Sequence, residues 1–313
     1  MNALPPHPPV VRTTCPYCGV GCGILAAVDR QGGATISGDP AHPANFGRLC
    51  SKGSALGETL SLEARLLHPM FRQADGSLAR TDWDTALTKV ANGLRSIVDR
   101  DGPDAIAFYL SGQLLTEDYY VANKLMKGFL GSANVDTNSR LCMASSVAGH
   151  RRAFGANVVP GIYRDLDEAD LIVLVGSNAA WCHPVLYQRM IAARNERGAR
   201  LVVIDPRRTA TAEAADLFLP IASGMDTALL CGLLAHLADT RMLNDGYIAQ
   251  HTTGFVDALA RAREIAVDAA ATARATGLDP DDVAASLSCS RKPSASLPAT
   301  RKGSINRRKA PTR

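Results

Sequence analysis

The chain has 313 residues and 46% hydrophobic content, which is enough for two or three domains with a sizeable core. It contains no run of 18 apolar residues, and residues 1–11 show neither an apolar stretch nor a twin arginine, so no transmembrane helix or export signal is visible. The net charge of +4 arises from residues 289–313, which hold eight Lys and Arg and no acid, so the remainder is mildly acidic. The charge therefore gives no reason to expect nucleic-acid binding.

The first predicted domain is organised around three cysteines spaced C-x2-C-x3-C and a fourth that is separated from the third by 27 residues. These are Cys15, Cys18, Cys22 and Cys50. Three thiols within eight residues, closed by one from a distant loop, are typical of a [4Fe–4S] cluster, and Gly19, Gly21 and Gly23 would let the backbone approach the sulfides. Two alternatives are a zinc site, which usually takes two pairs of ligands, and a disulfide knot, which needs an oxidising compartment. Eight cysteines without an export signal favour a cytoplasmic protein with metal-ligating thiols.

Within this domain, residues 23–28 and 34–38 read as two strands joined by a turn at 31–33. Such a hairpin would bring the third and fourth cysteines together. A helix is predicted from just after Cys50 to Leu62.

Strands and helices then alternate along the chain, which indicates βαβ units and an α/β fold with a parallel sheet. Uniformly apolar segments such as 171–175 are typical of central parallel strands. Strands are predicted at 104–110, 134–137, 171–175, 201–204 and 217–221. Helices are predicted at 82–100, where Asp82 is the expected cap, and at 116–130, 184–197, 226–237 and 255–275.

Polar loops follow three of these strands, at 176–178, 205–207 and 224–226. Backbone amides and polar side chains at the carboxyl ends of parallel strands suit a nucleotide. Taken singly, each loop reads as an ordinary strand–helix turn, and none has the G-x-G-x-x-G spacing of a nicotinamide site.

Cys142 lies in a polar turn that opens a helix of small residues. A thiol at a helix N-terminus has a lowered pKa and can ligate a metal or act as a nucleophile. From the residues alone, a buried structural cysteine is the commoner interpretation. Cys182, Cys231 and Cys289 have no comparable setting, and His183 reads as a capping or packing residue.

Four motifs in this order resemble the bis-molybdopterin guanine dinucleotide oxidoreductases, and among them the catalytic subunits of assimilatory nitrate reductases. The motifs are Cys-Pro-Tyr-Cys-Gly-Val-Gly-Cys (15–22), Leu-Cys-Ser-Lys-Gly (49–53), Asn-Ser-Arg-Leu-Cys-Met-Ala-Ser-Ser (138–146) and Val-Gly-Ser-Asn-Ala-Ala-Trp-Cys-His-Pro-Val (175–185). The resemblance runs from about Thr13 to Ser288 and covers the N-terminal portion of that family. It implies a [4Fe–4S] domain at 12–65 and a Rossmann-like, molybdopterin-binding α/β region at 66–288 that is incomplete relative to the family.

The resemblance also implies a role for each matching residue. The four cysteines would hold the [4Fe–4S] cluster, Lys52 would relay electrons between cluster and pterin, and Cys142 would be the thiolate ligand of molybdenum. The remaining residues would contact the Mo-bis(molybdopterin guanine dinucleotide) cofactor. They are Gln113, Asn138, Gly176, Ser177, Asn178, Asp205, Arg207 and Asp226.

The activity implied is reduction of nitrate to nitrite by oxygen-atom transfer in nitrate assimilation, with electrons from ferredoxin, flavodoxin or an NADH-dependent reductase subunit. Formate dehydrogenase is the nearest rival, but there a His typically follows the metal-ligating residue, whereas Met143 follows Cys142 here. A non-catalytic Fe–S electron-transfer module and a zinc-stabilised interaction protein with a basic, nucleic-acid-binding tail are rivals from other classes. Residues 289–313 do not resemble the family, so we expect a disordered basic tail or a frameshifted, truncated product.

Overall fold

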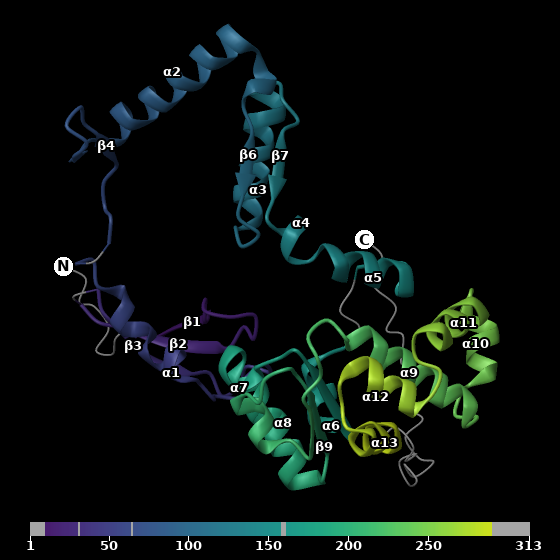
Figure 1. Ribbon diagram of the computed structural model, residues 1–313. Helices are drawn as coiled ribbons and strands as arrows, with labels where there is room; N and C mark the ends of the chain where they lie inside the picture. Colours follow the sequence, from purple (N-terminus) through teal and green to yellow (C-terminus); the bar gives the residue numbers. More distant parts are fainter. Residues whose placement is uncertain (1–9, 31, 64, 158–160, 290–313) are drawn as a thin grey trace, which may run out of the picture. The chain divides into compact units, whose positions relative to one another are not determined.

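The computed structural model describes residues 10–30, 32–63, 65–157 and 161–289 (Figure 1). The chain forms two compact units. One unit runs to Leu60 and resumes at Ile162, and the other covers Ser61–Gly161. None of the helices in the described residues has the length and hydrophobicity needed to span a bilayer. The tail expected after residue 289 lies outside the described residues.

The first unit begins with a small antiparallel sheet in the order β1-β2-β3. The predicted hairpin is present, because β2 pairs with β3 from Ile24 opposite Gly38 to Val28 opposite Ala34. Strand β1 was not predicted; it pairs with β2 along its whole length. The elements of this lobe are β1 (Val10–Thr14), β2 (Gly23–Val28), β3 (Ala34–Gly38), α1 (Ser51–Ser54) and the 3₁₀ helix η1 (Ala55–Leu60).

The same unit contains a parallel sheet in the order β10-β9-β8, as the alternation of strands and helices predicts. Its elements are α6 (Tyr163–Glu168), β8 (Leu171–Val175), α7 (Ala179–Cys182), α8 (Pro184–Arg197), β9 (Arg200–Ile204), η4 (Ala210–Ala214), β10 (Leu217–Leu219), α9 (Asp226–Asp239), α10 (Asp245–His251), α11 (Phe255–Ile265), α12 (Ala269–Thr276) and α13 (Pro280–Cys289).

The central strand β9 is buried on both faces from Leu201 to Ile204, and these residues are all apolar. The expectation that residues 171–175 form a central strand was wrong, because β8 lies at an edge of this sheet and exposes Val173 and Val175. Leu201 and Val203 pack with Met190 of α8, whereas Val202 and Ile204 pack with residues of α9, α12 and α13. Alternate side chains of one strand therefore join two helical layers, and these layers lie around the sheet in Figure 1.

The second unit contains a hairpin, a long helix and a parallel strand pair, β6-β7. Asp82 caps α2 as predicted, since its side chain accepts a hydrogen bond from the Thr85 amide. The elements are β4 (Met70–Arg72), β5 (Leu78–Arg80), α2 (Trp83–Asp101), η2 (Pro103–Ala105), β6 (Phe108–Leu110), α3 (Thr116–Asn123), the π-helix η3 (Lys124–Leu130), β7 (Val135–Thr137), α4 (Ser139–Cys142) and α5 (Ala144–Phe154).

Four predicted elements differ from the structure. The strand at 104–110 begins only at Phe108, because Pro103 starts a 3₁₀ turn, and the helix at 116–130 changes to π geometry after Asn123. The helix after Cys50 is a single α turn followed by 3₁₀ structure. The helix at 255–275 is two helices, because the Asp268 side chain accepts a bond from the Ala271 amide and caps a new start.

Candidate metal centre and nucleotide loops

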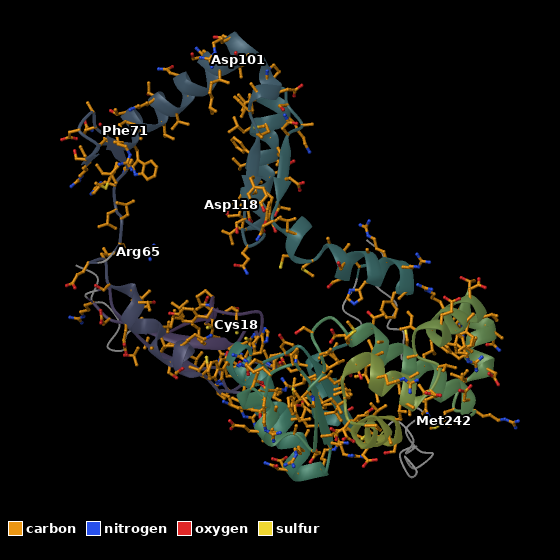
Figure 2. The ribbon with its side chains drawn as sticks, in the orientation of Figure 1. Cys18, Arg65, Phe71, Asp101, Asp118 and Met242 are labelled. Carbon is orange, nitrogen blue, oxygen red and sulfur yellow. The ribbon has the colours of Figure 1, made fainter. Side chains whose placement is uncertain are left out.

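The four predicted cluster cysteines line one apolar pocket. Cys15 and Cys22 are buried in the core of the lobe, where they pack with Val20 and Val185, and Cys18 and Cys50 are partly exposed. The amide of Cys15 donates to Cys22 O at 2.9 Å, which closes the loop between β1 and β2 that carries Cys18, labelled in Figure 2. The spacing read from the sequence therefore corresponds to a real gathering of four thiols.

Free thiolate charge is unfavourable in this pocket. Burial, followed by the neighbouring thiolates of Cys15, Cys18 and Cys50, raises the pKa of Cys22 to about 11. Four thiolates confined together repel one another unless metal ions balance their charge. Four thiols around one pocket are what a polynuclear Fe–S cluster requires. The residues present fit a [4Fe–4S] cluster.

Asn45 holds the lobe together, and sequence reasoning missed it. Its side chain is fully buried, accepts from the Gly23 amide at 2.8 Å and donates to Gly23 O at 3.0 Å and Arg48 O at 2.9 Å. This ties the segment before Cys50 to the strand after Cys22. The predicted glycine requirement holds at Gly21, whose φ is +65°.

Arg189 on α8 anchors the lobe to the parallel sheet's helices, and it too was missed. Its guanidinium is 3% exposed, forms a two-pronged ion pair with Asp167, and donates to Pro43 O at 2.8 Å and Ala44 O at 2.9 Å. The hydrogen bond with Asp167 raises the pKa of Arg189 despite its burial. A buried charge requires this complete set of partners. Because two of the partners are carbonyls of the loop that leads to Cys50, Arg189 holds that loop in place.

Two of the predicted nucleotide loops lie side by side at the carboxyl edge of the parallel sheet. Strand β8 ends at Val175 opposite Ile204, and the next amide, Gly176, donates to Ile204 O at 2.9 Å with φ +57°. In the neighbouring loop, Asp205 accepts from the Arg207 amide at 2.8 Å. Ser177 is half-buried in the first loop, and Asp226 is the half-buried first residue of α9.

Thr211 holds the first loop in place, which the sequence did not reveal. Its fully buried hydroxyl accepts from the Ala180 amide at 3.0 Å and donates to Asn178 Oδ1 at 2.9 Å. With its oxygen occupied, Asn178 can offer its Nδ2 hydrogens to a ligand.

In the second unit, the loops that carry Gln113 and Asn138 follow the paired strands β6 and β7 and touch one another. A Cβ on Gly112 would lie 2.5 Å from Asn138 Oδ1, so a larger residue there would displace the Asn138 side chain. Cys142 ends α4 four residues later and is exposed, so it is not a buried structural thiol. In the first unit, Lys52 is exposed on α1, two residues after Cys50.

Comparison with protein families gives two matches. Residues 8–61 match the molybdopterin oxidoreductase Fe4S4 domain, and residues 65–253 match the molybdopterin oxidoreductase model. Together they cover most of the chain.

Curated relatives match over much of this chain. A nitrate reductase of Klebsiella oxytoca is 58% identical over 75% of the chain, and a nitrate reductase of Shewanella frigidimarina is 49% identical over 86%. The aligned segments cover 27% and 29% of those proteins, so the chain spans less than a third of their length.

Among solved structures, acetylene hydratase from Pelobacter acetylenicus aligns with a TM-score of 0.75. The alignment covers 88% of this chain and 38% of the hydratase, with 24% identity, so it supports the fold. The fold of this chain is therefore shared with a known structure.

Proposed function

The chain belongs to the molybdopterin oxidoreductase family, and on that premise we propose that it carries the electron-transfer cluster and the molybdenum-ligating thiol of a nitrate reductase. The two family matches imply one [4Fe–4S] cluster and a Mo-bis(molybdopterin guanine dinucleotide) cofactor. The observation that carries the proposal is that four cysteines line one pocket. Three quarters of this chain is 58% identical to part of a nitrate reductase.

Each residue set has its own task in this proposal. Cys15, Cys18, Cys22 and Cys50 hold the cluster through thiolates whose mutual repulsion the iron offsets. Lys52 places a positive charge beside the cluster and so favours passage of an electron toward the pterin. Cys142, an exposed thiol, ligates molybdenum.

The polar loops of each unit have their own cofactor contacts in this proposal. Gly176, Ser177 and Asn178 offer amides and a side-chain donor to the guanine dinucleotide, together with Asp205, Arg207 and Asp226. Gln113 and Asn138 contact the cofactor from the loops after β6 and β7. When bound, the cofactor supplies oxygen-atom transfer from nitrate, and the cluster supplies single-electron transfer.

The test is metal content and activity of the anaerobically purified chain. We expect about four Fe and four sulfides per chain, and reduction of nitrate by a reduced viologen dye when the molybdenum cofactor is bound. Cys142→Ser should abolish molybdenum binding and nitrate reduction while leaving iron and sulfide unchanged. Cys182→Ser is the matched control, because Cys182 also ends a four-residue helix and is exposed.

Two results would contradict the proposal. Oxidation of formate in place of nitrate reduction would assign the chain to the formate branch. One zinc per chain without sulfide would remove the cluster and the redox function with it.

The physiological setting forms part of the proposal. We place the activity in nitrate assimilation in the cytoplasm, with ferredoxin, flavodoxin or an NADH-dependent reductase subunit as donor. All eight cysteines are unpaired, which suits a reducing compartment. Cell fractionation and reduction of the cluster by each candidate donor test this assignment.

A further inference from the structure

A tyrosine far from the cysteine motif is bonded to the cluster loop. Tyr163, the first residue of α6, donates its hydroxyl to the carbonyl oxygens of Gly19 at 3.0 Å and Val20 at 2.9 Å. These two residues lie between Cys18 and Cys22, and Val20 lines the pocket with the four cysteines. The hydroxyl therefore acts on the backbone that carries two cluster ligands.

The Tyr163 side chain is held in place by its surroundings. Arg189 lies over its ring, with the guanidinium carbon 5.7 Å from the ring centroid. Arg189 is itself fixed by Asp167 and by two carbonyls of the lobe. A tyrosine fixed in this way can impose an orientation on the loop.

The orientation follows from the geometry of the peptide group. In a trans peptide the C=O and the following N–H point in opposite directions, so carbonyls drawn toward Tyr163 turn the Val20 and Gly21 amides away from it. The Gly21 amide donates to Cys18 O at 3.3 Å, within the same loop. Val20 itself lines the pocket with the four cysteines.

We propose that Tyr163 is a positioning residue for the [4Fe–4S] cluster. Its hydroxyl holds the backbone of residues 19–20 so that the dipole of the amide between them stabilises the reduced cluster. Hydrogen bonds and dipoles near cluster sulfurs set reduction potentials, and groups that orient ligands govern metal retention. The inference rests on the cluster and is independent of nitrate as the substrate.

The test replaces Tyr163 with Phe, which removes the hydroxyl and keeps the ring beneath Arg189. The matched control is Tyr187→Phe, because the Tyr187 hydroxyl also faces a backbone carbonyl, Thr211 O at 3.5 Å, outside the cluster pocket. The readouts on the cluster-loaded chain are an EPR-monitored redox titration and the rate of iron loss to a chelator. We expect a more negative midpoint potential and about tenfold faster iron loss for Tyr163→Phe only.

An unchanged potential would overturn the inference, even with faster iron loss, because a purely structural hydroxyl would produce that result. If Tyr163→Phe fails to fold, 3-fluorotyrosine at position 163 provides a stronger donor of nearly the same shape. It should move the potential in the positive direction, and an unchanged or more negative value would overturn the proposal. A wild-type chain that takes up no iron and sulfide would overturn the cluster assignment itself. Iron analysis distinguishes that result from a cluster whose potential does not depend on Tyr163.

Discussion

Replacing Arg189 with Met should destabilise the first unit more than any exposed ion-pair change. The substitution keeps an unbranched apolar chain of similar reach but removes the guanidinium. Asp167 then loses its partner, and the carbonyls of Pro43 and Ala44 lose their donors. The segment between β3 and Cys50 would lose these polar contacts with α8.

The expected cost follows from burial. Removing one partner of a buried ion pair typically costs roughly 3–5 kcal/mol, because the remaining charge is left uncompensated. Arg189 is 3% exposed but the Asp167 side chain is 39% exposed, so the carboxylate can regain water. This places the expected loss near the lower limit, at about 3 kcal/mol.

The assay is urea unfolding of the cluster-free chain, followed by far-UV circular dichroism so that metal binding does not contribute. The control is Arg164→Met, which breaks an exposed pair with Glu168 on α6 and should cost less than about 0.5 kcal/mol. Equal losses for the two variants would show that Arg189 is not a structural anchor, and the reasoning from burial would be wrong.

Three further outcomes are expected. Cys50→Ser should reduce iron and sulfide far below the wild-type content while Cys231→Ser, in the apolar helix α9, retains both; equal iron contents would place the cluster elsewhere. Burial acts to raise the pKa of Asp216, but hydrogen bonds, above all that from Arg194, outweigh it and hold the pKa below its usual range. Ionised Asp216 thus stabilises the fold above its ordinary pKa of about 3.9, and this stabilisation is lost as the pH falls through the lower pKa of the folded state. Below about pH 4 the urea midpoint of Asp216→Asn should therefore fall less steeply with pH than that of the wild type. Parallel curves for the two proteins would contradict the direction of the pKa shift. Thr211→Val, which removes the hydroxyl that holds Asn178, should weaken binding of guanosine diphosphate to the chain by about fivefold in calorimetry, whereas Thr211→Ser should not; equal affinities would separate this hydroxyl from the site.

Features that depend on local order along the chain could be predicted from the amino-acid sequence. The spacing of Cys15, Cys18, Cys22 and Cys50 predicted a shared site, and the apolar run at 171–175 predicted a parallel strand, although not that this strand would lie at a sheet edge. Chain direction then placed the 176–178 and 205–207 loops at one sheet edge, because parallel strands end on the same side. Roles for Cys142 and the guanine-binding loops came from the family resemblance, and they stay predictions.

The side chains that hold these pieces in place became apparent only in the folded chain. Asn45 bonds Gly23 across 22 positions, Arg189 bonds Ala44 across 145, and Tyr163 bonds Gly19 across 144. No sequence periodicity marks such residues, because each polar side chain bonds to a backbone group that comes near it only when the chain folds. A buried arginine and a surface arginine look alike in a sequence, and what distinguishes them is the set of unpaired carbonyls and carboxylates that each one meets.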